Sequence, residues 1–322
     1  MKLDKTKAPG LLALVAAFTC FALAAPLTKW LATHGATLGV DGGKAISYCN
    51  VFFIGNVSAA LLLAGWFGFG TLVQDVKGLS PRAWFWVTLA STLSVAVSTL
   101  MYQALGATTV ANVVLLSRVG PLLFALVGSV VFGTRISRAE WVGNGFVLAS
   151  LLLVVFSQGG FSMNPGDFLA LESGVFYCLT TIAGRFAVRH AGVRPYMLLR
   201  NVIAAIVFFV LAIQMFGLHH FADAFQPRLW LVVTAYAAVA VVLAQAAWYF
   251  ALDRVDPVQV GSFSIVSPAM GMVFGLVLLD EQPIAAQWVA LGLTAVGAVI
   301  GSVFKAWDPR VETPPETAVA AR

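Results

Sequence analysis

Ten long apolar runs constrain this chain more than any other feature of its sequence. They lie at 11–33, 45–68, 83–104, 107–131, 138–157, 166–188, 196–217, 228–250, 256–279 and 284–304. Each is close to the roughly 20 residues that a helix needs to cross a bilayer. Hydrophobic residues make up 60% of the chain and charged residues 10%, against roughly 45–50% and about 25% in soluble domains. The sequence therefore predicts an all-α membrane protein of ten transmembrane helices, without a soluble domain.

The two ends of the chain and its cysteines need separate interpretation. The run 11–33 follows a basic start, as a signal peptide would, but it is too long and lacks a convincing cleavage site, so we expect it to remain as the first span. Residues 305–322 are polar and predicted to form a disordered cytoplasmic tail. Cys20, Cys49 and Cys178 lie in apolar runs without metal-ligand spacing, which predicts buried thiols and no metal site.

Positively charged residues are distributed unevenly between the predicted connections. If the amino terminus is cytoplasmic, 15 of the 19 Lys and Arg residues fall on the inner side, and the outer side keeps Lys29, Lys44 and Arg228. Arg118 falls within a span and counts on neither side. Because cytoplasmic connections carry the excess of Lys and Arg, this distribution predicts an inner-membrane protein with both termini in the cytoplasm. It also accounts for the net charge of +5 without a nucleic-acid partner.

The two halves of the chain repeat each other at a fixed offset. A shift of 147 positions aligns Tyr102-x-Ala104-Leu105 with Tyr249-x-Ala251-Leu252. In so apolar a chain, matched Tyr, Pro and Trp residues are more informative than matched Leu or Val residues. Without a gap, the same shift pairs Ser117 with Ser264, Pro121 with Pro268, Gly128 with Gly275, Trp141 with Trp288 and Gly145 with Gly292, and a weaker offset of 156 pairs Lys29 with Arg185 and His34 with His190.

The repeat predicts two structural units, residues 11–157 and 166–304, with five spans each. Because five is an odd number, the second unit enters the membrane in the opposite orientation. Inverted repeats of this kind are typical of secondary transporters, whose two related halves form gates around a site near the midplane of the bilayer.

These features resemble the drug/metabolite transporter superfamily, in its EamA-like branch of ten-helix transporters. The resemblance extends from about residue 11 to residue 304, and Lys29 and Arg185 stand where the family often has a basic residue ending the first and sixth helices. The first half departs from the pattern, because Thr134 stands where the second half has Glu281. The residues that carry the resemblance are the two Tyr-x-Ala-Leu segments, Pro121, Pro268, Leu278-Leu279-Asp280-Glu281, Trp288 and Gly292.

The resemblance implies a cavity enclosed mainly by spans one, three, four, six, eight and nine, with spans five and ten behind them. It also implies alternating access. The substrates of the family include amino acids, amphiphilic metabolites, organic cations and phosphorylated sugars.

Arg118 is the most informative single residue, because it lies near the centre of the fourth span. A charge facing lipid there costs at least about 2.5–3.5 kcal/mol, so we expect it to face the cavity or a buried partner. Its planar guanidinium could bind a substrate carboxylate or phosphate, while a structural ion pair is the alternative. Glu172, in the sixth span, is the natural counter-charge. It would clamp a zwitterion with Arg118, carry a coupling proton, or simply extend to water near the outer surface.

Polar and aromatic residues cluster on the predicted cavity helices, as an amphiphilic ligand would require. Interhelical hydrogen bonds and interfacial aromatic belts are the competing interpretation for each residue alone. Besides Arg118 and Glu172, the predicted substrate-binding residues are Tyr102, Gln103, Asn112, Ser117, Gln245, Trp248, Tyr249 and Ser264. Asn50, Asn56, Asn201 and Gln214 are instead expected to be packing or interface residues, and Glu281 to be a helix-boundary residue.

Pro121 and Pro268 are predicted hinges, because each removes a backbone hydrogen bond at an equivalent mid-span position of the two repeats. A static kink is the alternative. The chain has no phosphate-binding loop, nucleophile elbow or zinc-protease motif, so no enzyme activity and no cofactor are expected.

The predicted function is secondary active transport of a small polar or amphiphilic organic solute. An amino acid or related metabolite is the favoured substrate, export the favoured direction, and a proton a candidate coupling ion. Transport of organic cations such as choline, through an aromatic cavity, is the main alternative. A channel and a membrane-embedded enzyme are more remote ones. Monomer and homodimer both stay open.

Overall fold

The computed structural model describes residues 8–34, 48–133, 136–157, 163–217, 226–252 and 266–303, and within these ranges its regular structure is entirely helical. The helices are α1 (Ala8–His34), α2 (Tyr48–Phe67), α3 (Phe69–Lys77), α4 (Pro81–Ala107), α5 (Val110–Leu116), α6 (Val119–Phe132), α7 (Arg138–Ser157), α8 (Pro165–Ala191), α9 (Val193–Phe216), α10 (Pro227–Tyr236), the π-helix η3 (Ala237–Leu243), α11 (Ala244–Leu252), α13 (Val266–Leu279) and α14 (Ala285–Val303).

Most of these helices are long and apolar enough to cross a bilayer. Seven segments meet both criteria in the described residues, and α13 and α14 are shorter apolar helices. The helix α8 has 27 residues and carries Asp167, Glu172 and Arg185 among its apolar side chains. Each segment falls on a predicted apolar run, although the beginning of run 256–279 lies outside the described residues. The chain is therefore a multi-pass membrane protein, and the count of ten spans stays a prediction.

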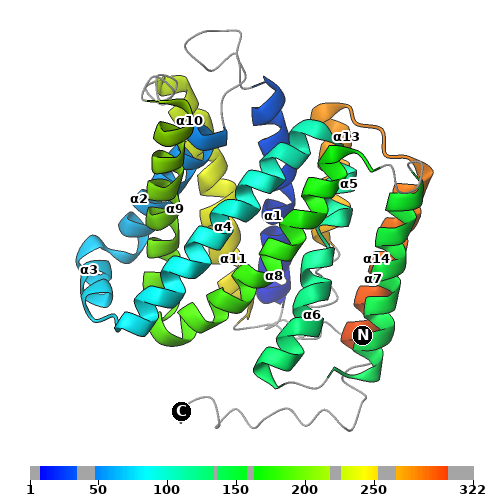
Figure 1. Ribbon diagram of the computed structural model, residues 1–322, viewed down its shortest axis with the longest axis horizontal. Coiled ribbons are helices and arrows are strands. Elements are labelled where there is room, and N and C mark those ends of the chain that lie inside the picture. Colours follow the sequence, from blue (N-terminus) through cyan, green and yellow to red (C-terminus); the bar gives the residue numbers. More distant parts are fainter. Residues whose placement is uncertain are drawn as a thin grey trace.

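The helices form a single bundle in which α1 occupies a central position, packed against α11 and α13 (Figure 1). The helices α4 and α8 run side by side, α2 packs against α9, and α7 packs against α14 at one edge of the bundle. The described part of α1 begins, and that of α14 ends, at the lower edge of Figure 1. These pairs bring both halves of the sequence into contact.

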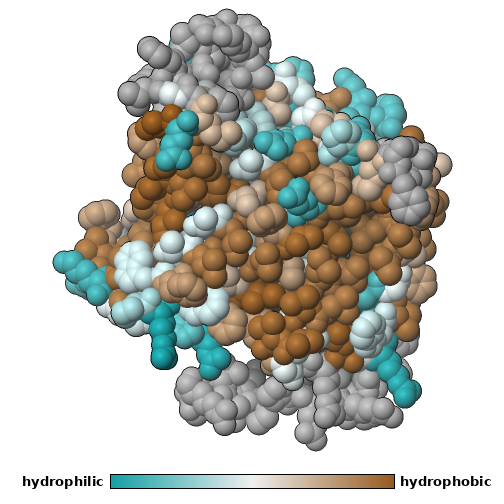
Figure 2. Space-filling model, in the orientation of Figure 1, coloured by the Kyte–Doolittle hydropathy of each residue, from teal (hydrophilic) through white to brown (hydrophobic). Residues whose placement is uncertain are grey.

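The surface of the bundle is that of a membrane protein. Figure 2 shows a broad hydrophobic band across one face, with hydrophilic residues mainly along the upper and lower edges. Large apolar side chains are strongly exposed there, for example Val130 at 82% and Leu231 at 72%. In water such exposure would be costly, whereas lipid tails solvate it.

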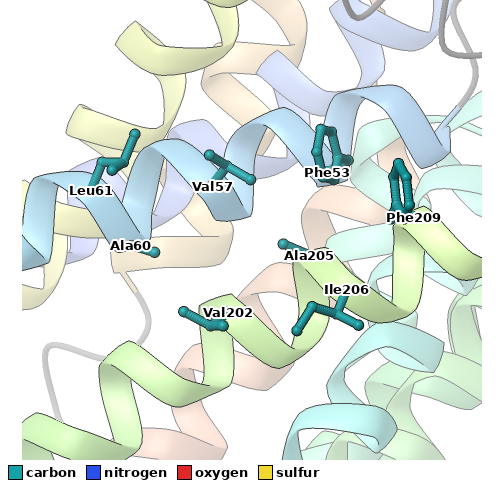
Figure 3. A pocket seen from close by; sticks show the side chains of 8 residues that line it. All are labelled: Phe53, Val57, Ala60, Leu61, Val202, Ala205, Ile206 and Phe209. Atoms are coloured by element: carbon teal, nitrogen blue, oxygen red, sulfur yellow. The ribbon is translucent and has the colours of Figure 1, made fainter. Parts of the chain in front are cut away.

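An apolar groove of about 390 Å³ lies between α2 and α9, with side chains from the two helices facing each other (Figure 3). Its lining is Phe53, Val57, Ala60, Leu61, Val202, Ala205, Ile206 and Phe209, and Leu61 and Ile206 are largely exposed. A second apolar pocket shares Ala60, Leu61 and Val202 and extends to α3. Both therefore belong to the lipid-facing exterior and not to a polar pathway.

Two pairs of glycines allow the helix backbones to touch. A Cβ added at Gly143 of α7 would lie 2.5 Å from the carbonyl oxygen of Gly297 in α14, and one at Gly120 of α6 would lie 2.8 Å from that of Gly174 in α8. Small residues at such contacts are the usual means of tight packing in membranes. The α7–α14 and α6–α8 pairs are thus fixed at close range.

The predicted fourth span is divided into α5 and α6 by a turn at Ser117 and Arg118. Pro121 is the third residue of α6 and has no N–H, so the carbonyl of Ser117 accepts from the N–H of Gly120 at 3.0 Å instead. Pro121 therefore lies in the middle of the span Val110–Phe132, as predicted, and in the first turn of α6, where a missing donor costs little; its role as a hinge stays a prediction. Pro268 is likewise the third residue of α13, and the residues before Val266 lie outside the described ranges.

Three further features depart from the simple predicted spans. The predicted helix 228–250 contains the π-helix η3, a rare structure that often marks functional sites. The connection between α2 and α4 contains the short amphipathic helix α3. Pro26 lies inside α1, where it removes the N–H partner of the Ala22 carbonyl, and Gly271 of α13 packs beside that carbonyl.

Candidate substrate cavity and gate

An ion pair joins the end of α1 to the end of α13. The Lys29 ammonium lies 2.7 Å from Glu281, and both side chains are largely buried, at 15% and 12% exposure. Lys29 also donates a hydrogen bond to the carbonyl oxygen of Thr108, which follows α4. The second oxygen of Glu281 accepts from the N–H of Val110 at 2.7 Å and so caps the first turn of α5. Two side chains thus connect the ends of three helices with the start of a fourth.

A buried polar network extends this contact to α8 and α14. Asp167 accepts hydrogen bonds from the Thr108 hydroxyl at 2.6 Å and from the Asn112 side-chain amide at 2.9 Å. The amide oxygen of Asn112 accepts in turn from Gln287 at 2.6 Å. In Figure 1 the start of α5, the end of α13 and the start of α14 lie together at the upper end of the bundle. We call Lys29, Thr108, Asn112, Asp167, Glu281 and Gln287 the upper lock.

Arg185 occupies the position that the repeat pairs with Lys29, but its contacts are different. Its guanidinium lies 4.8 Å from the centre of the Phe132 ring and 5.7 Å from that of Phe124, a cation–π arrangement. Arg185 makes no ion pair with the described residues. Because Phe132 ends α6 at the lower edge of the bundle (Figure 1), the two related basic residues act at different ends.

A polar cavity of about 260 Å³ lies in the middle of the bundle, between α1, α2, α4, α9, η3 and α11. Asn56, Ser94 and Ser98 come from near the middle of α2 and α4, and η3 contributes Ala237, Ala240 and Val241. The full lining is Phe21, Val51, Phe52, Gly55, Asn56, Ser94, Val95, Ser98, Arg200, Asn201, Ala204, Phe208, Tyr236, Ala237, Ala240, Val241 and Gln245. We call this space the central cavity, and it offers amides, hydroxyls, aromatic rings and one cation.

Arg200 is the charged residue of the central cavity. It lies about 10 Å along α9 from Val193, at 1.5 Å per residue, and is half-buried. Sequence analysis counted Arg200 among the inner-side charges, because the seventh span was expected to begin at residue 196. Since α9 begins at Val193, Arg200 lies almost a turn deeper than expected.

Arg118 and Glu172, the pair singled out from the sequence, lie at the start of α6 and on α8, two helices that pack against each other. Arg118 lies at the turn between α5 and α6, half-buried, with Tyr177 of α8 as an electrostatic neighbour. It is not among the residues that line the central cavity. Glu172 is half-buried in α8, and the two residues form no ion pair. A role for either in substrate binding stays a prediction.

Three of the other predicted binding residues make contacts in or near the site. Gln245 lines the central cavity, and its buried amide oxygen has no hydrogen-bond partner among the described residues. Asn112 belongs to the upper lock. Tyr102 packs against Phe52, with ring centres 5.8 Å apart.

Three of the remaining ones lie in the described residues but not in the lining of the central cavity. Trp248 packs edge-on against Phe18 of α1, with ring centres 5.6 Å apart. Gln103 is exposed on α4, and Ser117 lies at the turn between α5 and α6. The Tyr249 side chain and Ser264 lie outside the described residues.

Several residues of the site were not predicted. Asn56 and Asn201, expected to pack or to lie at interfaces, line the central cavity. Arg200 could have been recognised as an intramembrane charge, because an apolar run surrounds it. For Asp167 and Gln287 only the repeat architecture, which brings α5, α8 and α14 together, could have given a signal. The helix-boundary role expected for Glu281 is confirmed, although the helix that it caps is α5.

The known proteins that this chain resembles in sequence are named as transporters. Residues 164–303 match the EamA-like transporter family. The chain is 27% identical over 310 residues to the uncharacterized transporter sll1164 of Synechocystis sp., covering 94% of this chain and 88% of that protein. It is 25% identical over 187 residues to the uncharacterized inner membrane transporter YedA of Escherichia coli, covering 57% of this chain and 59% of that protein.

A solved crystal structure shares the fold. Its TM-score is 0.56 at 19% sequence identity, and the match covers 92% of this chain and 99% of the other. The membrane-crossing helices define a multi-pass membrane protein that contains a partly polar cavity, and the relatives that it resembles are named as transporters. Over residues 164–303 the chain is similar to the EamA-like transporter family, and over most of its length to an uncharacterized transporter.

Proposed function

We propose that this protein is a secondary active transporter of the inner membrane, which moves a small polar organic solute by alternating access. The observation that carries the proposal is the upper lock, in which the Lys29–Glu281 ion pair and its network join helix ends at one end of a bundle that also contains a partly polar cavity. Breaking this network would open a route from the central cavity to that end.

Pairings between the two halves support the inverted repeat that alternating access requires. The α4–α8 contact has its counterpart in the α1–α11 contact, and the α6–α8 contact in the α1–α13 contact. The pairs α2–α9 and α7–α14 each join equivalent helices of the two repeats. The EamA-like match at 164–303 agrees with the proposed second unit, 166–304, and leaves 11–157 as the first. Two such halves can exchange conformations and so produce a second, oppositely open state.

The proposed orientation has both termini in the cytoplasm, as the distribution of Lys and Arg indicates. The upper end of Figure 1 then faces outward, and the upper lock would be the contact that closes the outward side. The match to an inner membrane transporter of Escherichia coli supports the location. Export of an amino acid or related metabolite remains our preferred direction and substrate.

Flux into proteoliposomes tests the proposal. Purified protein should give saturable uptake of a radiolabelled amino acid mixture, and a pH gradient should change the rate if a proton is coupled. Liposomes with the variant Glu281→Ala, which removes the ion pair, serve as the matched comparison and should transport at a different rate. Flux that rises linearly with solute concentration and never saturates would indicate a channel and overturn the proposal.

Arg118 is a second candidate for substrate contact, and the same assay examines it. Its position at a break between two helices suits a residue that changes contacts during transport. Saturable uptake that Arg118→Ala abolishes would support a role in binding or gating. An unchanged flux in this variant would remove Arg118 from the site.

A further inference from the structure

Arg200 lies within the membrane-spanning helix α9, and none of the residues that the structure describes forms an ion pair with it. No described residue forms a hydrogen bond or ion pair with its guanidinium. A charge within the bilayer costs free energy, at least about 2.5 kcal/mol at the centre and less toward the surface, unless water or a partner compensates it. Its side chain faces the central cavity, which is where a partner can enter.

The charges around the central cavity define which partner fits. The described lining contains one Arg and no Asp, Glu, Lys or His. An organic cation would meet the rings of Phe21, Phe52 and Phe208, but it would also meet the uncompensated positive charge of Arg200. An anion would instead supply the missing counter-charge, and a carboxylate could form two parallel hydrogen bonds with the planar guanidinium.

The amides of the cavity add a second requirement. The Asn56 and Asn201 side chains each donate from Nδ2 to a backbone carbonyl of their own helix, at 2.7 and 2.8 Å, which keeps their amide oxygens as acceptors. The amide oxygen of Gln245 is buried without a partner in the described part of the chain. A buried acceptor without a donor is costly, so a ligand with N–H or O–H groups would satisfy it.

The size of the cavity limits the solute. At about 260 Å³ it is smaller than the roughly 300–1,000 Å³ typical of sites for drug-sized ligands. One cation matches one anionic group, not the two charges of a phosphate monoester. The space and the lining therefore suit a metabolite with a single carboxylate and one or two donor groups.

We infer that Arg200 binds the carboxylate of the transported solute, and that Asn56, Asn201 and Gln245 accept hydrogen bonds from its amino or hydroxyl groups. The substrate class is thus small amino acids and hydroxy acids, and organic cations are excluded. This inference rests on the proposed transport function and specifies its substrate.

Binding to the purified protein tests the inference without requiring transport. Thermal shift and calorimetry would compare proteinogenic amino acids and short hydroxy acids with their methyl esters, and with choline. At least one acid should stabilise the wild-type protein, and its ester, which lacks the anionic group, should not. Because this comparison changes only the ligand, it stays valid even if a variant fails to fold.

Variants of α9 provide the second arm. Arg200→Gln should weaken binding of the acid about ten- to a hundredfold, the loss expected for a charge-assisted contact, and Arg200→Lys should retain part of it. The matched control is Arg194→Gln, on the same helix, because Arg194 is exposed and pairs with Asp75 at 3.4 Å outside the cavity.

The outcomes separate the inference from the function on which it rests. Equal affinity of Arg200→Gln and wild type for the acid, or stabilisation by choline and by no acid, would overturn the role of Arg200. Acid binding that depends on Arg200 in a protein without flux would support the binding site and overturn the transport proposal. Saturable flux of a solute without a carboxylate would support the transport proposal and overturn the carboxylate-binding role of Arg200.

Discussion

The ion pair of the upper lock should control how often that end of the protein opens. In Glu281→Gln the neutral amide can still accept from Val110, so the cap of α5 is kept, but the charge opposite Lys29 is lost. Breaking a buried ion pair by removing one partner costs about 3–5 kcal/mol. The retained neutral hydrogen bond recovers about 1 kcal/mol. The partial exposure of both side chains lowers the net cost to about 2 kcal/mol.

This loss falls on the closed state, because an open upper end would already have separated Lys29 from Glu281. About 2 kcal/mol corresponds to a roughly thirtyfold higher ratio of open to closed protein. Spin labels at His34, the last residue of α1, and at Gln282, which follows α13, would report the change, since both positions are exposed. Distance distributions measured by double electron–electron resonance should gain a longer component in Glu281→Gln.

The matched control is Glu140→Gln, the same change at the first turn of α7, where Glu140 accepts from the N–H of Ser137 at 2.8 Å. It should leave the distribution unaltered. If Glu281→Gln and Lys29→Met both gave the wild-type distribution, the upper lock would be a static contact and the reasoning would fail.

Three further predictions concern packing, the network and Pro26 of α1. Gly143→Val should lower the free energy of unfolding by about 1–3 kcal/mol, because the new side chain would collide with Gly297. Gly145→Val should lower it much less, because a Cβ there meets nothing within 4 Å, and thermal unfolding in detergent compares the two variants. Asp167→Ala should destabilise by about 1–3 kcal/mol because Thr108 and Asn112 lose their acceptor, while Asp167→Asn, which retains an acceptor oxygen, should cost less; equal melting temperatures would contradict this. Pro26→Ala should restore the N–H partner of the Ala22 carbonyl and slow uptake in proteoliposomes if α1 bends at Pro26 during the cycle, and an unchanged rate would show that it does not.

The helices could be predicted from sequence because the bilayer imposes a simple requirement. A span must be long and apolar, and runs such as 138–157 meet it so plainly that α7 has the same bounds. Interruptions within a span carry no such signal. The π-helix η3 has the composition Ala-Ala-Val-Ala-Val-Val-Leu, which is equally compatible with an α-helix, so packing must decide its geometry.

The site was harder to predict, because it depends on contacts between distant segments. Lys29 and Glu281 lie near opposite ends of the sequence, and only the folded bundle brings them within 2.7 Å. Arg200 lies deeper than expected for a smaller reason, since α9 begins three residues before the expected start, which moves a side chain by about 4.5 Å along the axis. At the edge of a membrane that distance separates a surface charge from a cavity charge.

The glycine contact between α7 and α14 also determines which parts of the bundle can move. Two backbones in direct contact cannot slide past each other without colliding, so we expect α7 and α14 to move as one rigid unit at the edge of the molecule. In a transport cycle the other helices would then move relative to the α7–α14 pair. Fusion partners or surface tethers attached to α7 and α14 should accordingly interfere least with the transport cycle, so this edge is the preferred site for attaching them.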